Sequence, residues 1–153
     1  MAVPSSSQYD VFLSHSSVDK PRVEELARRL KQAGIEPFLD KWNLIPGQPW
    51  QEALEEALGQ SAACAVIIGS GPFGPWQHEE MRAALEHRVS GSRGKFPVIP
   101  VLLPAAERPH DHDLPMFLKR MTWVDFQKGL DDEQAFHRLV CGIRGIAPGP
   151  GPG

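Results

Sequence analysis

The segment from residue 62 to 85 constrains the fold of this chain more than any other. Its apolar run at 65–68 (Ala-Val-Ile-Ile) passes through a Gly/Pro loop into residues 76–80 (Trp-Gln-His-Glu-Glu), where a helical pattern starts. A short apolar run bounded by turn residues is typical of a buried parallel strand, and parallel α/β sheets bind ligands at the carboxyl ends of their strands. We therefore expect the indole and the two carboxylates of 76–80 at the mouth of a sheet.

Strand patterns and helix patterns alternate along the chain. The expected strands cover residues 9–13, 35–39, 62–68, 98–103 and 122–126, and the expected helices cover 19–33, 50–58, 76–88 and 131–146. Such alternation implies right-handed crossovers and a parallel sheet covered on both faces. We predict an α/β fold with a five-stranded parallel sheet in flavodoxin-like order and helices on both faces.

The helices expected at 19–33, 50–58 and 131–146 each have a defined apolar face, which in the first consists of Val23, Leu26, Ala27 and Leu30. Apolar residues recur in them near the i, i+3, i+4, i+7 spacing of an amphipathic helix. The other two faces are Trp50, Ala53, Leu54 and Ala57 in one helix, and Phe136, Leu139, Val140 and Ile143 in the last one. We expect these side chains to be buried.

Composition excludes several classes of protein. The 153 residues carry a net charge of −3, and the basic residues form no stripe of the kind a phosphate backbone requires, so we do not expect nucleic acid. Cys64 and Cys141 are far apart and form no CxxC motif, which favours two buried thiols. The first residues do not resemble a signal peptide, and no apolar run approaches the roughly 18 residues that a membrane span needs. We therefore expect a cytoplasmic protein without a membrane segment.

Domain boundaries follow from the two ends of the chain. Residues 1–8 are a polar lead that we expect to be flexible, and residues 9–146 form one domain. Residues 147–153 alternate Pro and Gly, which is typical of a linker or tail. This tail predicts that the natural polypeptide continues, or that the domain was cut from a larger protein.

Other motifs in the chain are poor candidates for function. Residues 69–74 match GxGxxG, but Pro72 and Pro75 lack the backbone N–H that binding of a pyrophosphate requires, and the loop follows the third strand. Residues 14–16 lack the acidic cluster of a phospho-receiver domain. Residues 110–113 (His-Asp-His-Asp) are adjacent in a Pro-flanked loop, which indicates a solvated loop and not a metal site.

The carboxylates at the helix entrance can perform chemistry. The helix dipole stabilises an ionised carboxylate in the first turn by about 0.3–1 kcal/mol. Such a group is no general acid, but it can stabilise positive charge that develops at an anomeric carbon. From the helix alone, the better interpretation of Glu79 and Glu80 is as surface residues that complement the dipole.

Four motifs in order resemble a known family. Residues 9–15 (Tyr-Asp-Val-Phe-Leu-Ser-His) are similar to its first strand, and residues 38–47, with Phe-Leu-Asp and Trp-Asn-Leu-Ile-Pro-Gly, to its second strand and BB loop. Residues 76–80 are similar to its W-x-x-x-E motif, and Phe126 falls at its FW-like box. Over residues 9–146 the chain resembles a TIR (Toll/interleukin-1 receptor) domain of the bacterial, NAD-cleaving kind.

The resemblance implies an NAD⁺ glycohydrolase that breaks the bond between nicotinamide and ribose. The products would be nicotinamide and ADP-ribose or its cyclised form, with NAD⁺ as substrate and without a cofactor or metal. Glu80 takes the catalytic position, and Trp76 lines the nicotinamide pocket. Glu79 lies about 100° round the helix from Glu80, so we expect only one of the two to face the cleft.

Further site residues are implied by the same resemblance. Ser14 and His15 would lie beneath the nucleotide, and Trp42 and Asn43 would belong to the loop that covers it. A packing role stays open for both Trp42 and Trp76.

The resemblance leaves the diphosphate without a defined partner. No basic residue follows His15 closely, although some family members have one there. Lys20, Arg22 or Lys41 could hold the diphosphate instead.

The family also implies partners. In many members the BB loop, here Leu44, Ile45, Pro46 and Gly47, completes the active site of a neighbouring protomer, which predicts a homo-oligomer or filament. A C-terminal sensor domain or partner subunit, and NAD⁺ depletion in antiphage defence, are typical of bacterial members. The alternative is a non-catalytic TIR scaffold that signals through protein contacts of the BB loop.

Overall fold

Five parallel strands form a single sheet at the centre of the molecule. The computed structural model describes residues 8–69, 79–92, 95–107, 118–119 and 121–151, with the backbone alone at 79–81. The strand order is β2-β1-β3-β4-β5 and every pair is parallel. The strands are β1 (Val11–Ser14), β2 (Pro37–Phe38), β3 (Cys64–Ile68), β4 (Val98–Leu102) and β5 (Val124–Asp125). The predicted flavodoxin-like α/β fold is confirmed.

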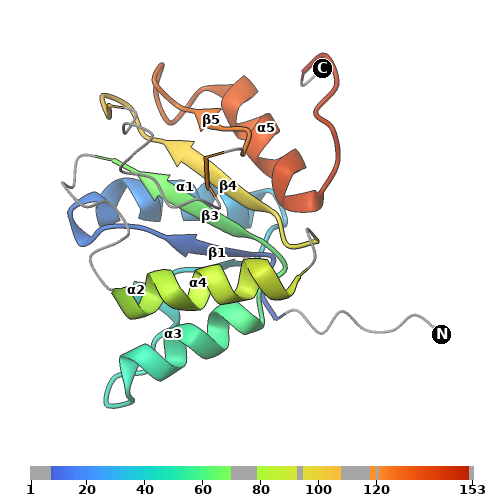
Figure 1. Ribbon diagram of the computed structural model, residues 1–153. Helices are drawn as coiled ribbons and strands as arrows, with labels where there is room; N and C mark the ends of the chain where they lie inside the picture. The colour runs from blue at the N-terminus through green and yellow to red at the C-terminus, as the bar shows by residue number, and fades with distance from the viewer. Residues whose placement is uncertain (1–7, 70–78, 93–94, 108–117, 120, 152–153) are drawn as a thin grey trace.

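Helices cover both faces of this sheet. They are the 3-10 turn η1 (Ser17–Asp19), α1 (Lys20–Gln32), α2 (Asp40–Asn43), α3 (Trp50–Gly59), α4 (Glu79–Gly91) and α5 (Glu133–Arg144). Figure 1 shows α1 and α5 on one face of the sheet and α3 and α4 on the other. The guanidinium of Arg29 lies 4.0 Å from the ring centroid of Phe136, which ties α1 to α5.

The central strand β3 forms the core of the sheet. All five of its side chains are buried, because β1 and β4 flank it and helices cover both of its faces. Cys64 and Cys141 are both buried and free, as expected. Burial raises the pKa of the Cys64 thiol well above its ordinary value, so this side chain is a small apolar core residue.

Helix burial differs from the sequence prediction at five positions. Trp50 at the start of α3 is 46% exposed and Ala53 and Leu54 are only partly buried, while Ala57 and Leu58 in its last turn are buried. The reason is that α3 packs along α4 at the outside of the layer, so only its last turn reaches the core (Figure 1). In α5, Phe136 and Val140 are only partly buried, because both lie at the margin of the core and not within it.

The segment that follows α5 lies against that helix. Residues 146–151 turn back beside α5 (Figure 1), and the Pro148 carbonyl accepts a hydrogen bond of 2.8 Å from His137 Nε2. The linker role of 147–153 stays a prediction, and residues 1–7 lie outside the described residues. Among the residues that the structure describes, no helix combines the length and apolar character of a membrane span.

Close packing joins the end of β3 to the turn after β1. Asp19 in η1 is buried, and its carboxyl group lies directly against the Cα of Gly69, which follows β3. A Cβ at residue 69 would overlap this carboxyl group. Any other residue at this position therefore requires a shift of the Asp19 carboxyl group or of residue 69.

We expect Gly69→Ala to lower the free energy of unfolding by about 1–3 kcal/mol, the usual cost of overpacking a core. Gly59→Ala is the matched control, because nothing lies within 4 Å of a Cβ at the end of α3. Urea unfolding of both variants measures the difference. Equal stability of Gly69→Ala and wild type would contradict this close contact.

Candidate functional site

Parallel strands bring polar residues to one edge of the sheet. β1 ends at Ser14, β2 at Phe38 and β3 at Ile68, and all three strands run in the same direction. Figure 1 shows that α4 starts at this same edge. The edge is where α/β sheets of this topology take their ligands.

His15 is the first residue after β1, and its side chain is only 5% exposed. Its Nδ1 lies 3.1 Å from the Leu13 carbonyl, which can only accept, so Nδ1 carries the proton and Nε2 faces Asp40 at 3.7 Å. Burial lowers the pKa of His15, and Lys20 acts in the same direction, whereas the Leu13 carbonyl, Asp40 and Asp19 oppose it. His15 is therefore a neutral imidazole at pH 7.

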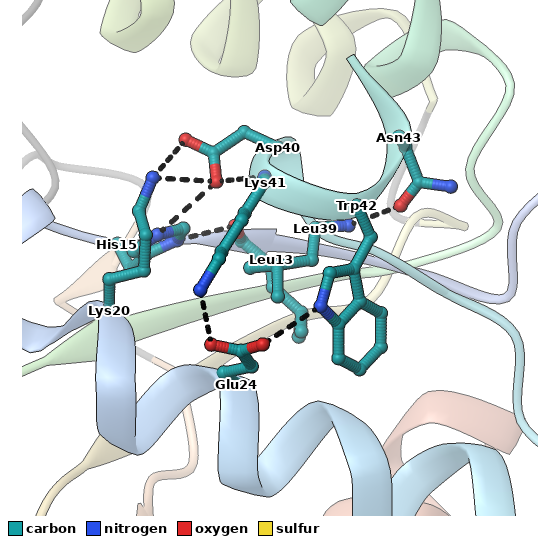
Figure 2. A network of polar contacts seen from close by, with 9 residues as sticks. All are labelled: Leu13, His15, Lys20, Glu24, Leu39, Asp40, Lys41, Trp42 and Asn43. Atoms are coloured by element: carbon teal, nitrogen blue, oxygen red, sulfur yellow. Dashed lines mark hydrogen bonds and ion pairs between the residues drawn. The ribbon is translucent and has the colours of Figure 1, made fainter. Parts of the chain in front are cut away.

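Asp40 links three parts of this edge. Lys20 Nζ donates to both carboxylate oxygens of Asp40, at 3.0 and 2.9 Å. The backbone N–H of Lys41 donates to Oδ1 at 2.6 Å, and the same oxygen faces His15. Figure 2 shows the resulting cluster, which joins the end of β1, the start of α1 and the start of α2.

Trp42 and Asn43 lie in α2, a one-turn helix in a segment that the sequence analysis assigned to a loop. Asn43 Oδ1 accepts a hydrogen bond of 2.9 Å from the Leu39 N–H and so closes the turn. Trp42 Nε1 donates to Glu24 at 3.1 Å, and the ring packs against the core. Both side chains therefore hold α2 in place.

The three cations considered for a diphosphate all have partners in the protein. Lys20 pairs with Asp40, Lys41 donates to Glu24 at 3.1 Å, and Arg22 donates to the Pro104 carbonyl at 2.8 Å. A diphosphate that engages one of the two lysines must share it with a carboxylate.

Two serines lie at the end of β1. Ser14 and Ser16 are both buried, with 6% and 1% of their surface exposed. Ser16 Oγ has no hydrogen-bond partner among the described residues. A buried hydroxyl without a partner is uncommon, and it leaves one donor and acceptor at this edge open to a ligand or water.

The BB loop follows α2 directly. Leu44 packs against the core, whereas Ile45 is 59% exposed. Gln48 N donates to the Ile45 carbonyl at 3.1 Å, and Gly47 has a φ of 93°, which a side chain would disfavour. The loop thus presents an apolar side chain on a tight turn.

The acidic helix entrance is described by its backbone. Glu79 and Glu80 are the first two residues of α4. Trp76 and the His-Asp-His-Asp segment at 110–113 lie outside the described residues. Within the part of the chain that is described, no three His, Cys, Asp or Glu side chains lie close enough to hold a metal ion.

Sequence reasoning assigned no role to Asp40, Glu24 or Ser16. Asp40 could have been found, because it directly follows the predicted strand 35–39 and so had to lie at the carboxyl edge. Glu24 gave no such signal, since it is one of several charged residues on an amphipathic helix.

Comparison with known proteins identifies relatives of this chain. The sequence model of the TIR domain matches residues 11–140. The NAD(+) hydrolase PdTIR of Paracoccus denitrificans is 30% identical over 96 residues, 61% of this chain and 32% of that protein. The 2' cyclic ADP-D-ribose synthase AbTIR of Acinetobacter baumannii is 24% identical over 142 residues, 92% of this chain and 47% of that protein.

A solved structure has the same fold. It is the TIR domain of the Toll-related receptor TRR-2 of Hydra magnipapillata, with a TM-score of 0.66 and 27% identity over 90% of this chain and 99% of that one. The chain spans about a third to a half of the two curated relatives above.

The lowered pKa of His15 predicts a pH dependence of stability. Its folded pKa is below the ordinary value of about 6.5, so the unfolded state binds more protons as the pH falls below that value. The contribution of neutral His15 to the free energy of unfolding is complete above about pH 6.5. It is lost as the pH falls towards the folded pKa, with a slope of up to about 1.4 kcal/mol per pH unit.

We expect His15→Gln to show a flatter fall in the free energy of unfolding than wild type between pH 7 and 5. Urea unfolding across this range measures the slope. His87→Gln is the control, because His87 is exposed on α4. Identical slopes for wild type and His15→Gln would exclude a neutral, buried His15.

Proposed function

Because this chain belongs to the TIR domain family, we propose that it is an NAD⁺ glycohydrolase that cleaves the bond between nicotinamide and ribose. Relatives named as an NAD(+) hydrolase and a 2' cyclic ADP-D-ribose synthase support this substrate. The observation that carries the proposal is the position of Glu80 in the first turn of α4, which starts at the edge where β1 and β3 end (Figure 1).

The reaction needs one ionised carboxylate and no general acid. The α4 dipole favours the charged form of a carboxylate in the first turn. In NAD⁺ the nicotinamide nitrogen is already cationic, so it takes the electron pair of the breaking bond and leaves as a neutral base. Positive charge then develops at the anomeric carbon of the ribose, and Glu80 stabilises it.

The second half of the reaction determines the product. Water that adds to the anomeric carbon loses a proton and gives ADP-ribose. Attack by a hydroxyl group of the same nucleotide gives a cyclic product instead. Both routes begin with the same cleavage and use the same carboxylate.

The substrate-binding residues that we propose surround this edge. Trp76 lines the nicotinamide pocket, Ser14 and His15 lie beneath the nucleotide, and Trp42 and Asn43 belong to the segment that covers it. The position of the last four residues around the ends of β1 and β2 supports this assignment. A neutral His15 is compatible with a place beneath the nucleotide, because an uncharged imidazole can form a hydrogen bond and needs no opposite charge beside it.

Self-association is part of the proposal. The BB loop presents Ile45 with 59% of its surface exposed, next to the proposed nucleotide site. We propose that the BB loop of one protomer docks on a second copy and completes its active site, in a homo-oligomer or filament. Burial of one such side chain contributes about 1.5–3 kcal/mol, enough to matter in a repeating contact.

The proposed cellular role is NAD⁺ depletion in antiphage defence, in the cytoplasm. A C-terminal sensor domain or partner subunit would drive assembly when it binds its signal. Loss of cellular NAD⁺ after phage infection, in cells that carry the natural gene but not in cells that carry its Glu80→Gln form, is the test of this role.

Nicotinamide release by the purified protein, held together by an inducible oligomeriser, tests the activity. We expect Glu80→Gln to lower the rate by about a hundredfold or more, since it removes the charge that stabilises the transition state. Glu79→Gln is the matched control and should keep most of the activity. No release by assembled wild type would favour the non-catalytic scaffold.

The exposed Ile45 side chain gives a separate prediction. Ile45→Arg should weaken self-association by about tenfold or more, because a charged group replaces apolar surface in the contact. Sedimentation velocity over a range of protein concentrations measures it. Ile146→Arg is the control, since Ile146 is similarly exposed at 58% but follows α5. Equal effects of the two changes would argue against docking through the BB loop.

A further inference from the structure

Glu24 in α1 holds the helix that precedes the BB loop. Its Oε2 accepts a hydrogen bond from Trp42 Nε1 at 3.1 Å, and its Oε1 accepts one from Lys41 Nζ at 3.1 Å. Arg28 Nη2, one turn along α1, donates to Oε2 at 3.0 Å. Figure 2 shows Glu24 on α1 facing the Trp42 indole and the Lys41 ammonium group on α2.

The carboxylate of Glu24 is in its charged form. The hydrogen bond from Trp42, followed by that from Lys41, lowers its pKa below the usual value. Its side chain is only 13% exposed although it lies on the surface of α1. Hydrogen bonds to an ionised acceptor are stronger than those between neutral groups. The bond from Trp42 Nε1 to the Glu24 carboxylate belongs to this stronger class.

The position of the BB loop depends on α2. Leu44 N donates to the Asp40 carbonyl at 3.0 Å, so the loop begins on the last turn of that helix. The helix itself has only four residues and cannot keep its place without outside contacts. Two contacts with α1 supply them, one from Lys20 to Asp40 and one from Glu24 to Trp42 and Lys41.

Of these two contacts, only that of Glu24 involves a large apolar group. The Trp42 ring packs against the core, and the Arg28 guanidinium lies 5.9 Å from its centroid. The indole N–H thus gives the Trp42 ring a polar partner on α1 in addition to its packing against the core. The ion pair between Lys20 and Asp40, whose side chains are 29% and 30% exposed, is a purely polar contact.

We propose that Glu24 is a positioning residue for self-association: through the indole N–H of Trp42 it fixes α2, and with it the orientation of the BB loop. This inference rests on the proposed function, in which the BB loop docks on a second copy. A loop that is ordered before it docks loses less conformational entropy on binding. Glu24 therefore acts on assembly and not on the chemical step.

The experiment uses four single variants and one double variant. Glu24→Ala removes the acceptor, Glu24→Gln keeps a neutral oxygen that can accept from the indole, and Trp42→Phe removes the donor but keeps an aromatic ring. The double variant combines Glu24→Ala and Trp42→Phe. Glu25→Ala is the matched control, because Glu25 is the exposed neighbour on the same helix.

Nicotinamide release is measured against protein concentration for each variant. We expect Glu24→Ala to raise the concentration for half-maximal release by about tenfold, with the same plateau rate. The reason is that the BB loop of this variant loses more conformational entropy when it docks. Glu24→Gln should recover part of this loss. Trp42→Phe should raise the concentration for half-maximal release as Glu24→Ala does, and its plateau rate is left out of the comparison because Trp42 is one of the proposed substrate-binding residues. The double variant should be no worse than either single change, because both remove one interaction.

Amide hydrogen exchange of residues 40–47 in the monomer provides a readout that needs no activity. Exchange should be faster in Glu24→Ala than in wild type and unchanged in Glu25→Ala. The indole N–H signal of Trp42, assigned by its loss in Trp42→Phe, should shift in Glu24→Ala.

Several results would overturn the inference. Additive effects of Glu24→Ala and Trp42→Phe, a lowered plateau rate with an unchanged midpoint, or unchanged exchange at 40–47 would each do so. If assembled wild type releases no nicotinamide, the proposed function fails. Sedimentation velocity of wild type and Glu24→Ala, together with their hydrogen exchange at 40–47, then still tests the role of Glu24 in self-association.

Discussion

The parallel hydrogen bonding of β3 with β1 and β4 is the constraint on which the rest of this molecule depends. β3 is buried along its whole length, so a charged side chain within this strand would be cut off from water. Because all five strands run in one direction, the loop after each strand opens at the same edge. The polar groups that follow β1 and β2 therefore gather there, although they are far apart in the sequence, and α4 begins at the same edge.

Two carboxylates organise the charge at this edge. Asp40 neutralises Lys20 and faces a neutral His15, while Glu24 accepts from Trp42 and Lys41. Opposite charges are thus already paired before any ligand arrives. These contacts between opposite charges join β1, α1 and α2 into one unit. The BB loop starts from this unit.

The alternation of strands with helices was predictable, because apolar runs and amphipathic spacing are local properties of the chain, and a parallel sheet follows from the right-handed crossovers that this alternation implies. The exposure of Trp50 was not, since it depends on how far α3 extends beyond the core it packs against. α2 was missed for a similar reason. Four residues carry no helical periodicity, and this turn exists because Asn43 and Trp42 bond to Leu39 and to α1.

The sequence by itself determined the parallel α/β fold, the TIR family motifs and the presence of two carboxylates at the start of α4. These follow from local patterns of polarity, which a chain carries into any environment. Only the tertiary structure decided that His15 is neutral, that Asp40 and Glu24 hold α2 against α1, and that Gly69 packs against the buried Asp19 carboxyl group. Such features arise from burial and from contacts between distant segments, and distances between those segments are set only when the sheet forms.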